Sequence, residues 1–202
     1  MSNSQLKPEW RIQAITTPIF QPEFNTYAIV EPELWCQWKE KLYQTDFDPS
    51  FTQLFETTQF SGIKNGPVLI QLNNSEALFN VTINALENNP CGCVLYTPKS
   101  TNFDDLVQQL RHNLVVVRGE AKALLRYYEP RTLLPLLGAM NTNERSQLFN
   151  GISQIIWFNK QWLSANSPDP IKSKKLKSWS ITNDHITTMQ SILTTWNGAV
   201  SS

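Results

Sequence analysis

The sequence predicts an α/β fold with a mixed β-sheet, flanking helices and a helical C-terminal part. Short runs rich in β-branched and aromatic residues alternate with helical patterns over most of the chain, as in α/β proteins. The chain has 202 residues, 41% of them hydrophobic, which is enough for one substantial core. The sequence shows no internal repeat, so we expect a single domain.

Within that domain we expect four consecutive parts. They are an N-terminal extension over residues 1–22, an α/β core over 23–164, a basic proline-containing linker over 165–177, and a C-terminal strand and helix over 178–202.

The first strand is predicted at Tyr27–Val30, where four residues of high β-propensity follow one another. Pro32 suits the first position of a helix, and an apolar stripe at four-residue spacing follows it. The stripe consists of Leu34, Trp38 and Leu42. A short helix is expected over 51–57. Gly66-Pro67 then introduces a strand over Val68–Leu72.

Helix caps mark the next elements. Asn74 or Ser75 can cap a helix that ends before Asn89-Pro90, and Gly92–Tyr96 is the following strand. Asn102 caps another helix, whose first turn carries acidic residues that favour the helix dipole.

Residues 112–118 and 122–128 are rich in Val, Leu and Tyr, and Gly119-Glu120 between them indicates a hairpin. Pro130 then starts a helix through Leu137. Residues 141–144 form a capping box for a further helix through Phe149.

The remaining elements follow Gly151. Residues 152–158 are apolar on both faces, which is typical of a central strand. A short strand is expected over Ser178–Ile181. Thr182 caps a last helix with the stripe Ile186, Met189, Ile192, Leu193 and Trp196.

The charge balance argues against nucleic acid and membrane partners. Seventeen basic and seventeen acidic residues cancel, so no overall field attracts polyanions. No apolar run approaches the roughly 20 residues of a membrane span, and residues 1–13 do not look like a secretory signal. Three cysteines, Cys36, Cys91 and Cys93, give no disulfide framework. We therefore expect a cytoplasmic protein.

Few residues could carry chemistry. The usual nucleotide, phosphate and hydrolase motifs are absent, and Cys91 and Cys93 with only two histidines do not supply a convincing metal site, so we expect no cofactor. Two alternatives stay open. Cys93 and His112 could form the nucleophile and base of a small cysteine-dependent hydrolase. The lysines at 172, 174, 175 and 177, with Trp179, could bind phosphates.

The segment Leu125–Arg131 combines charges with an apolar strand. Alternation in a strand would put Arg126 and Tyr128 on one face, and Pro130 would begin a helix directly afterwards. Glu129 faces the positive end of that helix and could pair with Arg126 or Arg131. The charges either brace this corner or form a recognition patch, because Arg and Tyr are frequent hot-spot residues.

The same segment resembles the effector adaptor or chaperone family of bacterial type VI secretion, the Tap or TEC proteins, catalogued as domain of unknown function 4123. The family hallmark is a strand ending in Phe/Leu-Arg-Phe/Tyr-Tyr-Asp-Pro-Arg. Other matching pieces follow in family order: Tyr27–Val30, Leu54-Phe55, Gly66–Leu69, Gly92–Tyr96, Leu106–Arg111 and Ile181–Asn183. Glu129 replaces the family's usual Asp. Since Glu is a poorer N-cap, we expect this corner to depend more on ion pairing than on capping.

The resemblance implies a non-enzymatic adaptor with two protein partners. It would bind a toxic effector in the cytoplasm, near the effector's N-terminal segment, and promote its loading onto the VgrG spike. The expected protein-binding residues are Arg111, Arg126, Tyr128, Glu129 and Arg131. No cofactor, metal or nucleic acid is implied.

Overall fold

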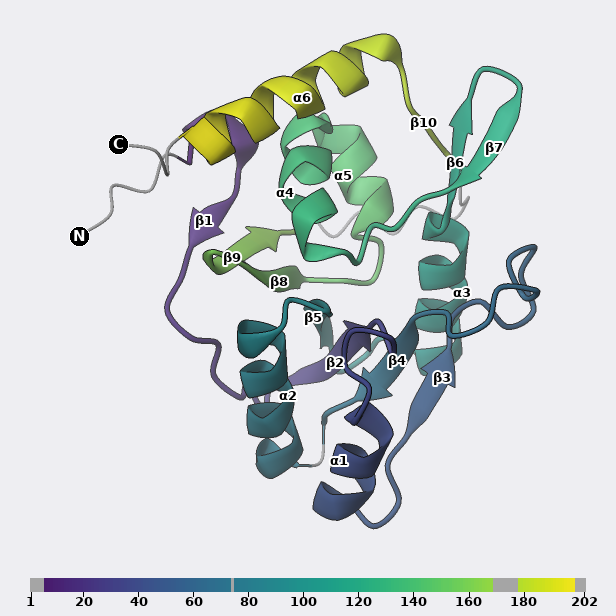
Figure 1. Ribbon diagram of the computed structural model, residues 1–202, viewed down its shortest axis with the longest axis vertical. Coiled ribbons are helices and arrows are strands. Elements are labelled where there is room, and N and C mark those ends of the chain that lie inside the picture. Colours follow the sequence, from purple (N-terminus) through teal and green to yellow (C-terminus); the bar gives the residue numbers. More distant parts are fainter. Residues whose placement is uncertain (1–5, 74, 169–177, 199–202) are drawn as a thin grey trace.

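The computed structural model describes residues 6–73, 75–168 and 178–198. These residues form helices on both faces of a large sheet, with a smaller sheet at one end, which confirms the α/β class (Figure 1). The helices are the 3₁₀-helix η1 (Pro8–Trp10) and α1 (Trp38–Thr45), α2 (Glu76–Asn88), α3 (Phe103–Asn113), α4 (Pro130–Ala139), α5 (Thr142–Leu148) and α6 (Asn183–Gly198). The strands are β1 (Gln13–Ala14), β2 (Phe24–Val30), β3 (Phe51–Gln53), β4 (Val68–Gln71), β5 (Gly92–Pro98), β6 (Val115–Arg118), β7 (Ala121–Leu124), β8 (Gln154–Asn159), β9 (Gln161–Asn166) and β10 (Trp179–Ser180).

The large sheet has seven strands in the order β1-β9-β8-β5-β2-β4-β3, and every neighbouring pair is antiparallel. β5 lies at its centre, between β2 and β8, and the two C-terminal strands β8 and β9 lie between β5 and the N-terminal strand β1. The expected mixed pairing occurs in the small sheet, β10-β6-β7, where β10 runs parallel to β6 and β7 runs antiparallel to it.

Two apolar layers enclose the large sheet. Successive residues of its strands point to opposite faces, so Ile29 and Cys93 enter one layer while Val30 and Val94 enter the other. The first layer contains the buried side chains of α3, α4, α5 and α6, and the second contains those of α1 and α2. Figure 1 shows α4, α5 and α6 on one side of the sheet, with α1 and α2 on the other.

Several local predictions are confirmed. Ser75 and Asn102 cap α2 and α3 through hydrogen bonds from the backbone N–H groups of the first turn. Asn141 and Glu144 form the reciprocal capping box at the start of α5. Thr182 accepts a hydrogen bond from the backbone N–H of His185 at the start of α6. Asn74 lies outside the described residues.

The helix expected from Pro32 begins instead at Trp38. The carbonyl oxygen of Leu34, which an earlier helix would need, accepts a hydrogen bond from the side chain of Asn89. The N–H of Trp38 therefore bonds the carbonyl of Trp35 (2.9 Å), and residues 32–37 form turns. Only Leu42 of the predicted stripe is fully buried.

The helix expected over 51–57 is wrong. Phe51–Gln53 instead pairs with β4 as the edge strand β3, because tertiary pairing overrides a weak local preference. Thr57 has φ 60°, in the left-handed region, which a right-handed helix excludes.

The linker expected from residue 165 is wrong at its start. Residues 161–166 form β9, which returns from β8 through Lys160, a residue with φ 65°. Turns with a positive φ usually contain Gly, Asn or Asp, so a turn at a lysine is not indicated by the composition of this segment. Residues 169–177, with the four lysines, lie outside the described residues.

Candidate protein-binding site

The segment that joins β7 to α4 is a turn, not the strand end that the alternation predicted. β7 ends at Leu124, and the N–H of Leu125 adds one more bond to the hairpin, to the carbonyl of Leu114 (2.7 Å). The chain then turns, and the N–H of Glu129 bonds the carbonyl of Arg126 (3.1 Å). Pro130 begins α4, as predicted.

Both tyrosines of the turn belong to the core. The rings of Tyr127 and Tyr128 meet edge to face with centroids 5.7 Å apart, and both residues are buried. The Tyr127 hydroxyl donates to the carbonyl of Leu110 in α3 (2.9 Å). Burial raises the pKa of Tyr128 to about 12, although the neighbouring Arg126 acts in the opposite direction. Tyr128 was expected in a binding patch, but the structure places it beneath that patch as support.

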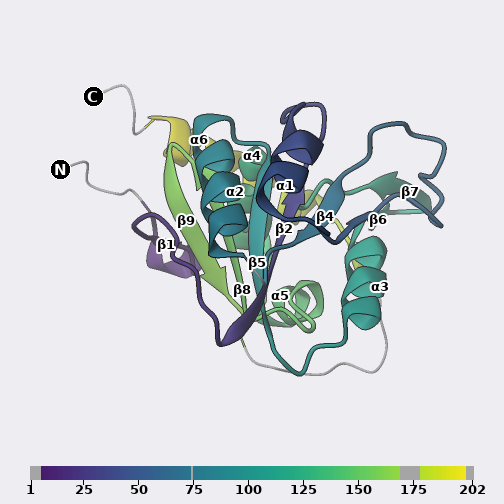
Figure 2. The same cartoon turned by 90° about the horizontal axis from the view of Figure 1, so that it is seen from below.

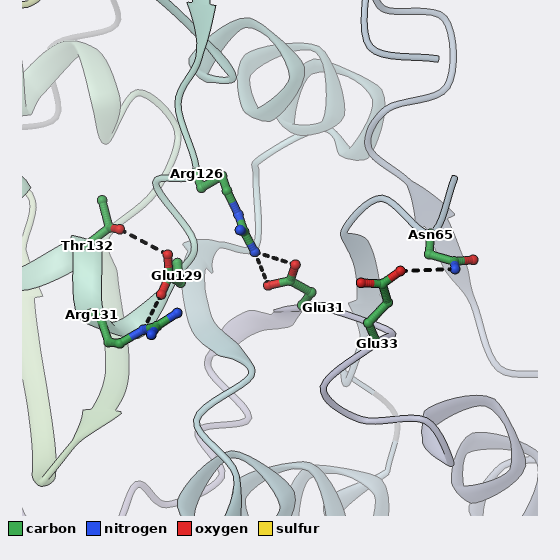
Figure 3. A network of polar contacts seen from close by, with 7 residues as sticks. All are labelled: Glu31, Glu33, Asn65, Arg126, Glu129, Arg131 and Thr132. Atoms are coloured by element: carbon green, nitrogen blue, oxygen red, sulfur yellow. Dashed lines mark hydrogen bonds and ion pairs between the residues drawn. The ribbon is translucent and has the colours of Figure 1, made fainter. Parts of the chain in front are cut away.

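Arg126 pairs with Glu31, which follows β2, and not with Glu129. One guanidinium nitrogen contacts both carboxylate oxygens (Figure 3). The Arg126 side chain is 41% exposed and that of Glu31 17% exposed. Burial alone would lower the pKa of Arg126, but the charge of Glu31, with smaller effects of Tyr128 and Glu129, raises it. The ion pair therefore ties the turn to the large sheet.

Glu129 pairs with Arg131. Its carboxylate accepts hydrogen bonds from Arg131 Nε and from the Thr132 hydroxyl, while its main-chain carbonyl accepts from the N–H groups of Thr132 and Leu133. As expected from the sequence, Glu129 makes an ion pair here and its side chain does not cap the backbone of α4.

Arg131 is the most exposed charge of the corner. Its side chain is 81% exposed, whereas that of Glu129 is 13% exposed. The bond to Glu129 uses Nε, and Figure 3 shows the far end of the guanidinium directed away from this contact. A guanidinium held in this way can bind a carboxylate of another protein through two parallel hydrogen bonds.

Arg111, also expected in the patch, lies elsewhere. Its Nη2 donates to the carbonyl of Gln53 (3.1 Å) at the outer edge of β3. Among the described residues, no hydrogen bond or ion pair links Arg111 to the corner. The arginine covers part of an otherwise open sheet edge.

The residues proposed for a hydrolase occupy different environments. Cys93 is buried in β5 between Ile29 and Trp157, and burial raises the pKa of its thiol far above the usual range. His112 lines a small cavity with Glu144 and Trp179. Within the described part of the chain His112 Nε2 is buried and has no hydrogen-bond partner, and no three metal-ligating side chains lie together.

The sequence did not indicate the structural roles of two charged residues, Glu31 and Arg145. Glu31 binds Arg126 across 95 positions of sequence, and its only local signal was an acid placed directly after an apolar strand. Arg145 is 2% exposed and donates to the carbonyls of Trp10 (2.8 Å) and Arg11 (3.1 Å), which fixes the N-terminal segment. Nothing in its local pattern distinguishes it from a solvated arginine.

No helix in the described part of the chain has the length and apolar character that a membrane crossing would require.

A family model matches more than half of the chain. The family model described as "Domain of unknown function (DUF4123)" matches residues 26–147, which is more than half of the 202 residues. The matched region runs from β2 to α5 and includes the corner with Arg126 and Arg131. No curated protein and no solved structure matches the chain.

Proposed function

The chain belongs to the DUF4123 family, a domain known from type VI secretion effector adaptors, and we propose that it is itself such an adaptor. In this proposal it is a non-enzymatic cytoplasmic protein that binds an effector near the effector's N-terminal segment. It then promotes loading of that effector onto the VgrG spike.

The observation that carries the proposal is the construction of the corner. Arg131 is held through Glu129 at the start of α4, and the turn beneath it is anchored by the buried Tyr127 and Tyr128. A side chain fixed in this way loses little conformational entropy when it binds, so its contacts contribute more to affinity. Exposed arginines on rigid supports are typical of interface hot spots.

The proposal is tested by co-expression with candidate effectors and spike proteins encoded beside the gene. We expect at least one effector to be retained on the tagged chain through purification. If every effector and spike candidate passes through unbound, the adaptor proposal is wrong.

A variant separates binding from support of the fold. Arg131→Ala removes an exposed guanidinium, so we expect effector affinity to fall about tenfold or more while the melting temperature changes by less than about 2 °C. Lys99→Ala is the matched control, because Lys99 is another exposed cation and lies outside the corner. If Arg131→Ala lowers the melting temperature clearly as well as the effector affinity, the corner has only a structural role.

A further inference from the structure

The β6–β7 hairpin leaves one strand edge open. Within the described residues β7 pairs only with β6, and Ala121, Lys122 and Ala123 are all exposed. Figures 1 and 2 both show this hairpin extending from the body of the protein. Gly119, with φ 60°, makes the tight turn that joins its strands.

The pairing register shows which main-chain groups of β7 are free. Leu125 bonds Leu114 across the hairpin (2.7 Å), and antiparallel strands bond their partner at every second residue. Ala123 and Ala121 therefore also bond β6, whereas Lys122 and Leu124 direct their N–H and C=O groups away from it. The same alternation on β6 directs the Val117 carbonyl toward β10, where it accepts from the N–H of Ile181 (2.9 Å).

The other sheet edges in the described residues are shorter or covered. β1 and β10 contain two residues each, and the outer carbonyl of Gln53 in β3 is bonded to Arg111. Among those residues, nothing bonds the outward main-chain groups of Lys122 and Leu124. The alanines that flank Lys122 are small, so an approaching chain can reach the backbone.

The charges near this edge favour an acidic occupant. Arg118 and Lys122 are exposed, and neither makes an ion pair within the described residues; Glu120 in the turn is the only acid of the hairpin. A second copy of the chain would bring the same basic residues of two hairpins together, which opposes self-pairing. An acidic strand would instead place its carboxylates beside Lys122 and Arg118.

We propose that the outer edge of β7 binds an extended acidic segment of the effector, which adds a fourth strand to the β10-β6-β7 sheet. Lys122 and Leu124 supply main-chain donors and acceptors, and the basic side chains select for acidic residues. The identity of the occupant rests on the proposed adaptor function, whereas the capacity of the edge to bind an acidic strand does not.

The edge is tested first with synthetic peptides. A short peptide of alternating Val and Glu, at about 1 mM, should slow amide hydrogen exchange at Leu124 in the full chain, and a Val/Lys peptide should not. Lys122→Pro should abolish this protection, because Pro removes an outward N–H without taking a bond from β6. Lys122→Ala keeps that N–H, so it should weaken protection by the acidic peptide only in part.

Three results, two with the peptides and one on the oligomeric state, would overturn the inference. They are no protection of Leu124 in the wild-type chain, equal protection by the two peptides, and a wild-type dimer that Lys122→Pro converts to monomer, which would identify a second copy as the occupant. The wild-type measurements hold even if Lys122→Pro fails to fold, which near-UV circular dichroism would show.

The effector is the second probe. An effector retained by the wild-type chain should bind Lys122→Pro at least about tenfold more weakly, and undiminished binding to the folded variant would overturn the inference. If the acidic peptide binds but no effector is retained, the adaptor proposal fails and the strand site stands. The two failures are therefore distinguishable.

Discussion

Gly92 begins β5 at a point where the backbone of β2 leaves no room for a side chain. A Cβ built at this position would lie 1.8 Å from the carbonyl oxygen of Ile29, and real Cβ atoms essentially never lie closer than 3.0 Å to such an atom. Because the obstacle is main chain, no rotation of a side chain relieves it. We predict that Gly92→Ala strongly destabilises the fold.

The magnitude follows from the displacement that alanine requires. The contact falls 1.2 Å short of 3.0 Å, so β2 and β5 would have to separate locally by about that distance. A ladder bond of about 2.9 Å would lengthen to about 4.1 Å, beyond hydrogen-bonding range. Losing two or three such bonds, with the adjoining core contacts, should reduce the free energy of unfolding by about 3 kcal/mol or more.

Thermal unfolding followed by circular dichroism measures this effect. A loss of about 3 kcal/mol corresponds to a fall of about 6–12 °C in the melting temperature of a chain of this size. Gly62→Ala is the matched control, because no described atom lies within 4 Å of its Cβ position. Gly138→Ala should be intermediate, since its Cβ would come too close only to the end of the Ile192 side chain, at 2.7 Å, and would make an ordinary contact with Trp10 at 3.5 Å. A melting temperature for Gly92→Ala within about 2 °C of the wild type would refute the reasoning.

Other predictions concern thiols, pH and a buried charge. Cys36 is exposed, so it should react with a thiol reagent in the folded protein, whereas Cys91 and Cys93 should react only on unfolding; fast alkylation of Cys93 near neutral pH would revive the hydrolase alternative. Burial raises the pKa values of Cys91 and Tyr128 to about 12. Their contribution to the free energy of unfolding is therefore complete below pH 9. It falls at higher pH, because the unfolded chain releases protons that the folded chain keeps. Urea unfolding at pH 8 and pH 10 should show the decline, by about 1 kcal/mol or more, and a flat profile would contradict it. Arg145→Ala should cost about 3–5 kcal/mol and expose the chain near Arg11 to trypsin; unchanged digestion would mean that the N-terminal segment is held without Arg145.

Local chemistry was sufficient to predict much of the fold. Ser75, Asn102 and Asn141 cap helices with their own side chains, and each bond joins residues only two or three positions apart. Such signals are visible in sequence because both partners lie within one turn. The segment at Phe51 failed for the opposite reason, because its strand exists only through pairing with β4.

The candidate site was predictable only in part. The Glu129–Arg131 pair spans two residues and could be anticipated, but the acid that binds Arg126 lies 95 positions earlier in the chain. Tyr128 was expected to share a strand face with Arg126, an assumption that fails once the strand ends at Leu124. The tertiary arrangement decides which arginine pairs within the protein, as Arg126 does with Glu31, and which is exposed to a partner, as Arg131 is.

The pairing of the first strand with a late strand also constrains how the protein is made. β1 pairs with β9, and Gln13 lies opposite Ser164, so the first strand to leave the ribosome has no partner for about 150 residues of synthesis. At about 5–20 residues per second that interval lasts about 8–30 s. After β5 is complete at Pro98, it lacks its neighbour β8 until that strand ends at Asn159, and it presents an unpaired edge meanwhile. A nascent chain stopped at residue 147, the end of the family match, would keep this edge of β5 unpaired and able to pair with strands of other chains.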